Sequence, residues 1–227
     1  DKLYLGTNQG LFYRNIDSEE SFKLIENTQG QVWSLTIIDD QLFCGHTSGT
    51  FIIDQNKSTT IFDTQGTWIL KKIDNNTIIQ GCYDGLYILE KKNRVWSLRN
   101  KIKGFSNSSK YIAKFGAHDF FVNHEYKGVF KLTLDSDLRK VVHLSKEKSL
   151  QKGLHSSLIS FQDKILYSSK KGVYLYNKEK DVFTRDSIYS QLNSEDNFIS
   201  VVINQDLEAS GMLRKKYTNL NALTFRN

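Results

Sequence analysis

The chain has 227 residues, of which 39% are hydrophobic and 25% are charged, so the disordered and collagen-like classes are excluded. It contains 14 Phe and 11 Tyr but no proline, and aromatic residues are typical of sheets because they pack well on a pleated surface. No apolar run approaches the ~18 residues that a membrane-spanning helix needs. No signal peptide is recognisable and Asp1 stands within an apparent strand, so we expect a piece of a longer protein.

The net charge of +6 raises the hypothesis of nucleic-acid binding, because neutralisation of phosphates drives such binding. However, the lysines are spread along the chain and are mixed with 25 acidic residues. The densest run, Lys91 to Arg94, falls where we expect the tip of a hairpin. We therefore interpret the excess charge as solvated turn residues, and expect no direct contact with nucleic acid.

A short segment recurs along the chain, in which an apolar strand leads into a turn closing on glycine and a second strand follows. A tight hairpin turn needs a residue at positive φ, where a Cβ would clash, and this explains the glycine. The first three copies carry an earlier glycine (Gly6, Gly45 and Gly81), which we expect to permit close approach of another backbone. The copies read LYLGTNQGLFYR, LFCGHTSGTFII, IIQGCYDGLYIL, FFVNHEYKGVFKL and ILYSSKKGVYLY, and the turn glycines, including that of a degenerate sixth copy, are Gly10, Gly49, Gly85, Gly128, Gly172 and Gly211.

Two more apolar segments flank each copy, and four short strands per ~40 residues is the spacing of a propeller blade. The sequence predicts an all-β fold, a β-propeller of four-stranded antiparallel blades with about six repeats. We expect residues 1–227 to form a single propeller domain, either complete or part of a larger propeller. The predicted upstream strands cover 32–38, 67–73, 111–115, 157–161 and 198–203, and the downstream strands begin at Ser21, Thr60, Val95, Val141 and Val182.

The two ends of the chain depart from the repeat. The first copy lacks an innermost strand, which would precede Asp1. The last copy has its inner strand at 198–203, but the second strand around Leu207 is weak. Residues 213–227 could supply outer strands or lead out of the domain, and closure of the propeller is left open.

The pattern GTxxGLYxY resembles the repeats of the regulator propellers of bacterial sensors, and the best matches are 6–13, 81–89, 125–132 and 167–176. Such repeats occur in hybrid two-component regulators and in related triple-tyrosine, helix-turn-helix transcriptional regulators typical of Bacteroidetes. The resemblance implies a periplasmic, extracytoplasmic sensor region whose adjoining domains include a three-tyrosine immunoglobulin-like domain. A kinase or a DNA-binding output would lie beyond the membrane. The resemblance also makes an oligosaccharide a plausible ligand.

In a propeller, the turns between second and third strands share one face with the segments that connect consecutive blades. Aromatic residues beside amide, hydroxyl and carboxylate groups would suit a polar ligand with apolar faces, such as a sugar. The alternative is that an aromatic residue recurring in each blade is a packing wedge, and that the polar turn residues are simply solvated. The candidate ligand-binding residues are Trp33, Trp68, Tyr111, His46, Tyr83, Asp84, His124, Glu125 and Tyr126.

Catalytic and metal sites find little support. The five histidines show no HxH, HxxxH or CxxC-type spacing, and no GxSxG motif is present, so we expect no metal, no cofactor and no catalytic residues. Cys44 and Cys82 would project from opposite faces of successive blades and could point toward each other. Packed sheets lie ~10 Å apart, beyond the ~7 Å that a disulfide allows between Cα atoms, so we expect two buried free thiols.

Three functions compete. The favoured hypothesis is a ligand-sensing module of a signal-transduction regulator that binds a small molecule or an oligosaccharide and is not an enzyme. The second is a scaffold for protein–protein interaction, and the sequence also leaves a homodimer open. The third is a propeller glycosidase or lyase, which would require converging carboxylates such as Asp84 and Glu125.

Overall fold

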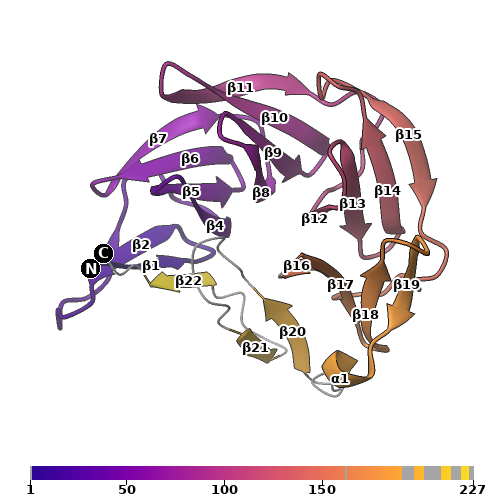
Figure 1. Cartoon of the computed structure of the whole chain (residues 1–227). Helices are drawn as coiled ribbons and strands as arrows, with labels where there is room; N and C mark the ends of the chain where they lie inside the picture. Colours follow the sequence, from indigo (N-terminus) through magenta and orange to yellow (C-terminus); the bar gives the residue numbers. More distant parts are fainter. Residues whose placement is uncertain (1, 162, 191–196, 202–210, 216–220, 225–227) are drawn as a thin grey trace. The chain divides into compact units, whose positions relative to one another are not determined.

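The computed structural model describes residues 2–161, 163–190, 197–201, 211–215 and 221–224, and the chain divides into two compact units. Unit 1 comprises residues 1–101 and 219–227 and holds three four-stranded antiparallel sheets, in the orders β22-β1-β2-β3, β4-β5-β6-β7 and β11-β10-β9-β8 (Figure 1). Its strands are β1 (Lys2–Gly6), β2 (Leu11–Asn15), β3 (Lys23–Leu24), β4 (Val32–Ile38), β5 (Gln41–His46), β6 (Gly49–Asp54), β7 (Lys57–Phe62), β8 (Thr67–Asp74), β9 (Thr77–Cys82), β10 (Gly85–Lys92), β11 (Val95–Lys101) and β22 (Asn221–Thr224).

Unit 2 comprises residues 102–218 and holds the sheets β12-β13-β14-β15 and β16-β17-β18-β19, the two-stranded sheet β20-β21 and one short helix. No helix in the described part of the chain has the length and apolar character needed to cross a membrane. The elements are β12 (Tyr111–Lys114), β13 (Asp119–His124), β14 (Gly128–Leu134), β15 (Val141–Lys146), β16 (Ser157–Phe161), β17 (Lys164–Ser169), β18 (Gly172–Asn177), β19 (Val182–Arg185), α1 (Ser187–Ser190), β20 (Asn197–Val201) and β21 (Gly211–Lys215).

The predicted repeat is confirmed as a four-stranded antiparallel unit. In each of the five four-stranded sheets the second and third strands form the glycine hairpin, and the turn glycine lies at positive φ, from 93° at Gly128 to 147° at Gly10. The predicted strands at 32–38 and 157–161 match β4 and β16. Lys91–Arg94 is a hairpin tip as expected, since Asn93 and Arg94 both have positive φ between β10 and β11.

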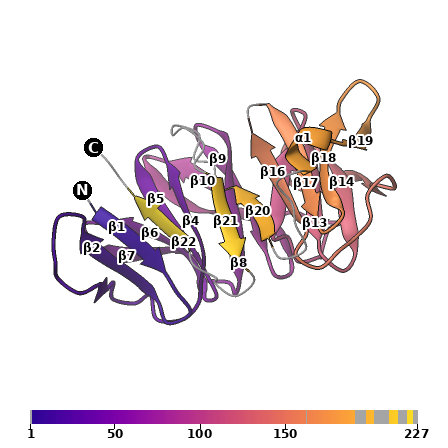
Figure 2. The ribbon, with the colours of Figure 1, turned by 90° about the horizontal axis from the view of Figure 1, so that it is seen from below.

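The first sheet corrects the expectation for the ends of the chain. Its innermost strand does not precede Asp1, because β22 pairs antiparallel with β1, with Leu3 opposite Thr224 and Gly6 opposite Asn221 (Figure 2). Within the segment 213–227, residues 221–224 therefore supply an inner strand rather than an outer one. β21 begins at Gly211 and pairs directly with β20, so Gly211 opens a second strand and not a third. The weak strand expected around Leu207 lies outside the described residues.

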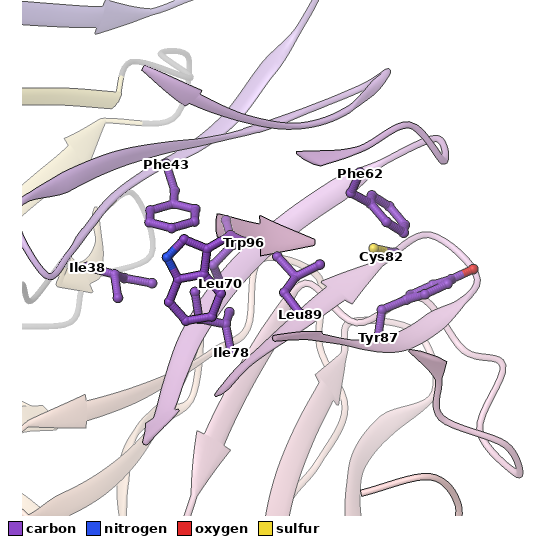
Figure 3. Packing of buried hydrophobic residues seen from close by; sticks show 9 residues of the cluster. All are labelled: Ile38, Phe43, Phe62, Leu70, Ile78, Cys82, Tyr87, Leu89 and Trp96. Atoms are coloured by element: carbon purple, nitrogen blue, oxygen red, sulfur yellow. The ribbon is translucent and has the colours of Figure 1, made fainter. Parts of the chain in front are cut away.

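Unit 1 is held together by apolar clusters between neighbouring sheets. One cluster joins the sheet β4–β7 to the sheet β8–β11, and Trp96 lies at its centre with 2% of its surface exposed (Figure 3). The rings of Phe43 and Trp96 meet edge to face at 5.9 Å, and those of Phe62 and Tyr87 meet at 4.9 Å. Each sheet has apolar residues on both faces, so a single sheet could not bury its own surface.

The early glycines of the repeat lie where neighbouring sheets approach most closely. A Cβ on Gly45 would lie 2.7 Å from the carbonyl oxygen of Thr67, at the start of the next inner strand. A Cβ on Gly6 would lie 2.6 Å from Cγ1 of Val32. The expectation that these glycines permit close approach of another backbone is confirmed for Gly45, whereas Gly6 makes room for the side chain of Val32.

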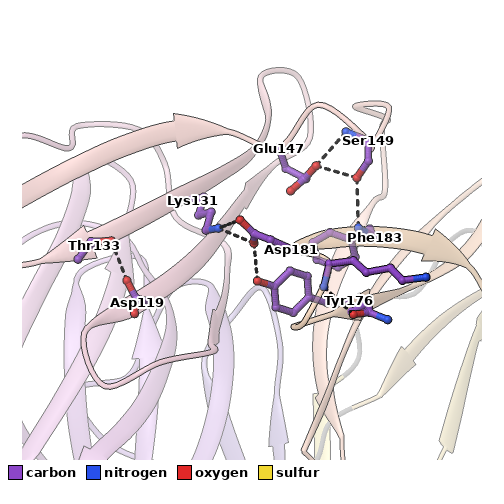
Figure 4. A network of polar contacts seen from close by, with 10 residues as sticks. Asp119, Lys131, Thr133, Glu147, Ser149, Tyr176, Asp181 and Phe183 are labelled. Atoms are coloured by element: carbon purple, nitrogen blue, oxygen red, sulfur yellow. Dashed lines mark hydrogen bonds and ion pairs between the residues drawn. The ribbon is translucent and has the colours of Figure 1, made fainter.

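In unit 2 packed phenylalanine and tyrosine rings and a polar network join the two four-stranded sheets. Phe121 of β13 packs against Phe183 of β19 with ring centroids 5.2 Å apart. Beside them, Asp181 accepts hydrogen bonds from Lys131 and from the hydroxyl of Tyr176, which lies 2.6 Å away (Figure 4). The bond from Lys131 holds the pKa of Asp181 below its usual value, while burial and the hydrogen bond to Asp181 raise the pKa of Tyr176.

The cysteines are free and buried, as predicted. They do not point toward each other, because Cys44 packs with Leu11 and Val32 while Cys82 packs with Phe62 and Tyr87 in a different cluster. Burial raises the pKa of both thiols, that of Cys82 to about 12.

The turn glycines can be tested by alanine substitution. Gly49→Ala would place a Cβ 2.0 Å from the carbonyl oxygen of Phe62 at a φ of 143°. We expect a loss of roughly 1–3 kcal/mol or more in the free energy of unfolding, measured by urea denaturation. Gly153→Ala is the control because a Cβ there meets nothing within 4 Å, and it should change stability by less than ~1 kcal/mol. Equal effects of the two substitutions would contradict the assignment.

The thiols can be tested by their reactivity. Because both thiols are buried and protonated at neutral pH, an aromatic disulfide reagent at about pH 8 should label neither in the folded protein and both after unfolding in guanidinium. Rapid labelling of either thiol in the folded protein would show that its surroundings are open.

Candidate functional site

Within each unit, the turns between second and third strands lie beside the segments that lead into the inner strand of the next sheet. In unit 1 the N–H of Gly66 donates to the carbonyl of Thr47 at 2.8 Å, and the N–H of Tyr83 donates to the carbonyl of Gly66 at 3.0 Å. In unit 2 the ammonium of Lys127 donates at 2.6 Å to the amide oxygen of Asn107, in the segment that leads into β12 of the same sheet, and a Cβ on Gly128 would lie 3.7 Å from Cβ of Lys152, in the segment that leads into β16. These contacts confirm, within each unit, the shared face expected from the repeat. We call this face the rim of each unit.

Both tryptophans of the unit 1 rim occupy β-bulges. The pairing of β4 with β5 shifts between Val32 and Ser34, leaving Trp33 as the extra residue. The pairing of β8 with β9 shifts in the same way around Trp68. A bulge breaks the alternation of a strand and redirects one side chain, so the same device places an indole at the same position of two consecutive sheets.

The two indoles and one phenol form a single group, which we call the aromatic cluster (Trp33, Trp68 and Tyr83). The ring centroids of Trp33 and Trp68 lie 4.2 Å apart, and Tyr83 lies 5.0 Å from Trp68 and 6.2 Å from Trp33. Gly66 supports the cluster, because a Cβ there would lie 2.2 Å from Cγ of Tyr83. All three side chains are half-buried, which leaves part of each aromatic surface open.

Tyr111 does not share the position of the tryptophans. It pairs with Asn123, which places it at the register of Ser34 and one residue deeper than the bulge. The residue at the level of Trp33 and Trp68 is instead Lys110, whose ammonium lies 5.4 Å from the centroid of the Tyr111 ring. The sequence does not show this offset, because the bulges that place Trp33 and Trp68 have no counterpart in the pairing of β12 with β13.

The histidines of the rim serve as turn caps. Nδ1 of His46 accepts the N–H of Ser48 at 3.1 Å, and Nδ1 of His124 accepts the N–H of Tyr126 at 3.2 Å. The same repeat position carries Thr7 and Ser169, whose hydroxyl oxygens accept the N–H two residues later at 3.0 and 3.3 Å. Burial lowers the pKa of both histidines, so they stay neutral and can accept these bonds at neutral pH.

The two candidate carboxylates are each bound by a lysine. Asp84 pairs with Lys101 of β11 and accepts the hydroxyl of Tyr87 at 3.0 Å. Burial would raise the pKa of Asp84, but these hydrogen bonds outweigh it and hold the pKa below its usual value. Glu125 lies 3.3 Å from the ammonium of Lys110. The structure thus directs Asp84 toward the outer strand of its sheet and not toward the aromatic cluster.

The remaining candidate, Tyr126, is 67% exposed at the tip of the β13–β14 turn, 6.2 Å from the ring of His124. In the described residues no group of three or more His, Cys, Asp and Glu side chains could hold a metal ion. Of the nine candidates, the structure brings together Trp33, Trp68 and Tyr83 in unit 1, and Glu125, His124 and Tyr126 in the turn of unit 2. Sequence reasoning missed Gly66 and Lys110, which take part in these groups.

No protein-family model matches the chain, and comparison with curated proteins gives no match. Among solved structures, the WD40 β-propeller domain of Doa1 is similar at 12% identity and a TM-score of 0.59, over 87% of this chain and 70% of that one. The extracellular domain of BT4673 from B. thetaiotaomicron, described as a one component system, is similar at 16% identity and a TM-score of 0.61.

The BT4673 match covers 98% of this chain but 32% of the other, so this chain spans about a third of that domain. A second structure of the BT4673 extracellular domain, described as part of a hybrid two component system, gives 16% identity and a TM-score of 0.60. At these identities the likeness shows the fold alone. Together with the five four-stranded antiparallel sheets, it shows that this chain is an all-β protein with the β-propeller fold.

Proposed function

We propose that this chain is an extracytoplasmic ligand-sensing propeller of a bacterial signalling regulator, and that the aromatic cluster contacts an oligosaccharide. The observation that carries the proposal is the pair of bulges that present Trp33 and Trp68 at the rim of consecutive sheets. The likeness to an extracellular domain of a two component system supports the same class of function.

The chemistry of the aromatic cluster suits a saccharide. A sugar ring has apolar C–H faces, which pack on aromatic rings, and hydroxyl edges, which need hydrogen-bond partners. The half-buried rings supply the aromatic surface for the C–H faces, and the neighbouring turns supply hydrogen-bond partners for the hydroxyl groups. Near the cluster, the side-chain amide of Gln31 donates to the amide oxygen of Asn8 at 3.0 Å in an exposed position, and the hydroxyl of Ser48 lies 2.7 Å from Nδ1 of His46.

The position of the cluster also offers a way to signal. Trp33 belongs to the sheet β4–β7, whereas Trp68 and Tyr83 belong to the next sheet of unit 1. A ligand bound across both sheets would favour one spacing between them over another. The ligand can shift the equilibrium between two such conformations only as far as its affinities for them differ. The carboxylates Asp84 and Glu125 are each neutralised by a lysine, which favours binding over acid–base catalysis in this proposal.

The proposal is tested with residues 1–227 on an array of neutral and acidic oligosaccharides, followed by titration of the bound sugars by isothermal titration calorimetry, a readout that does not depend on the tryptophans. Trp33→Ala combined with Trp68→Ala should weaken binding about tenfold or more, because it removes the aromatic surface. The thermal midpoint should stay nearly unchanged, since both side chains are half-buried. The pair Trp33→Phe and Trp68→Phe keeps aromatic faces and should retain most of the affinity.

Trp96→Ala is the stability control, because Trp96 is 2% exposed and its loss should cost about 3–5 kcal/mol. If the double alanine variant loses stability as Trp96→Ala does, the tryptophans are packing wedges and the proposal is wrong. It is equally wrong if the double variant stays folded and binds sugars as tightly as the parent chain.

A further inference from the structure

The net charge of the protein is unevenly distributed along the chain. Acidic and basic residues balance in unit 1, so the whole formal excess of +6 belongs to residues 102–218. In unit 1 both lysines of the densest basic run are paired, since Lys91 binds Asp39 at 3.3 Å and Lys92 binds Glu90 at 2.7 Å. The basic character that the sequence shows is therefore a property of unit 2.

Within unit 2 the excess gathers at the rim. The turns at the opposite ends of its four-stranded sheets mix both signs: Asp135 and Asp137 with Arg139 and Lys140, Asp163 with Lys164, and Glu179 and Asp181 with Lys178 and Lys180. The described rim turns and connecting segments instead carry seven lysines against three carboxylates, Glu125, Glu147 and Asp186, and we call five of these lysines the rim lysines. These rim lysines are Lys110, Lys127, Lys152, Lys170 and Lys171.

The contacts of the rim place these lysines side by side. The β13–β14 turn lies against Lys152, because a Cβ on Gly128 would be 3.7 Å from Cβ of Lys152. On the other side of the same segment, the ammonium of Lys171 donates to the side-chain oxygen of Gln151. The segment Gln151–Lys152 therefore lies between two turns, which bring Lys127 and Lys171 to either side of Lys152.

The positive charge of this surface is not neutralised by the protein. In the part of the chain that the structure describes, none of Lys127, Lys152, Lys170 and Lys171 pairs with a carboxylate, and all four are exposed. Lys127 and Lys171 bind amide oxygens, which hold the side chains in place but leave their charge. Only Lys110 is paired, with Glu125 at 3.3 Å.

We propose that the rim of unit 2 binds the acidic groups, carboxylates or sulfates, of an anionic oligosaccharide. Ammonium groups attract such groups as point charges, and a surface of one sign raises the local concentration of ligands of the other. The half-buried ring of Tyr111 and the exposed ring of Tyr126 add apolar faces beside the lysines. The choice of a saccharide over other polyanions rests on the proposed function, whereas the requirement for negative charge rests on the lysines alone.

The test compares four probes. Two are acidic hexasaccharides, derived from chondroitin sulfate and from polygalacturonate, the third is uncharged maltohexaose, and the fourth is single-stranded hexathymidylate. Binding to the folded chain is measured by calorimetry at about 50 and 300 mM NaCl, since pairing between exposed charges is screened by salt. We expect at least one acidic saccharide to bind more tightly than maltohexaose, and to weaken with salt. The oligonucleotide should bind less tightly than that saccharide.

The rim variant replaces Lys127, Lys152, Lys170 and Lys171 with glutamine. The control replaces Lys114, Lys164, Lys178 and Lys180, which are also exposed and outside the ion pairs of the described residues, so both variants lose the same net charge. The rim variant should weaken the acidic saccharide about tenfold or more at low salt, whereas the control should change its affinity less than about twofold. Circular dichroism and the thermal midpoint verify that both variants are folded.

The results separate this inference from the proposed function. Equal losses in the two variants, no binding of either acidic saccharide, or oligonucleotide binding as tight as that of the saccharide would overturn the inference. If the binding of uncharged sugars depends on Trp33 and Trp68, and the affinity for acidic sugars is the same in the rim variant as in the parent chain, the proposed function stands and this inference is wrong. Binding of acidic saccharides that needs the lysines but not the tryptophans supports the inference and contradicts the proposed role of the aromatic cluster.

Discussion

The arrangement of the sheets depends on how closely one inner hairpin can approach the next. At Gly45 the absence of a side chain lets the carbonyl of Thr67 come within 2.7 Å of where a Cβ would be. In unit 2 the same repeat position carries Asn123, whose amide donates to the carbonyl and the hydroxyl of Ser156, both at 3.0 Å. Glycine gives direct contact between neighbouring sheets, whereas asparagine joins them through side-chain hydrogen bonds.

In unit 1 a buried network of hydrogen bonds also fixes the register between two neighbouring sheets. The hydroxyl of Thr50 lies 2.9 Å from that of Thr67 and 3.0 Å from the amide oxygen of Gln80. An amide oxygen only accepts, so Thr50 uses its single hydroxyl hydrogen to donate to Gln80. Thr50 therefore accepts the hydrogen bond from the hydroxyl of Thr67. The amide nitrogen of Gln80 then reaches Sγ of Cys82 at 3.4 Å. Because all four residues are buried, a shifted register between the two sheets would leave these groups unsatisfied.

The sequence predicted the parts of the fold that depend on neighbouring residues. A tight turn requires positive φ, so glycine marked five hairpins, and the short apolar segments on either side marked the strands. The pairing of β22 with β1 could not be read in this way, because it joins segments from distant parts of the sequence with no turn between them. The single domain over residues 1–227 stays a prediction.

The candidate site was predictable to a similar degree. Trp33 and Trp68 could be found from their place at the start of the inner strands, but the bulges that redirect them leave no mark in composition. Lys110 was missed because Tyr111 is the first aromatic residue of its strand, and the sequence does not reveal that the pairing of β12 with β13 has no bulge there. His46 and His124 drew attention as titratable groups, whereas their position relative to Thr7 and Ser169 shows the role of a turn cap.

The pairing of β22 with β1 also sets an order of events during synthesis. The sheets β4–β7 and β8–β11 are each built from consecutive strands, so their hairpins can form as soon as those strands leave the ribosome. The sheet that contains β1 must wait for residues 221–224, and until then β1 exposes an unpaired edge. The sheet of β1 is thus completed later than the two sheets that follow it in the chain, and the open edge of β1 needs protection from aggregation during that interval.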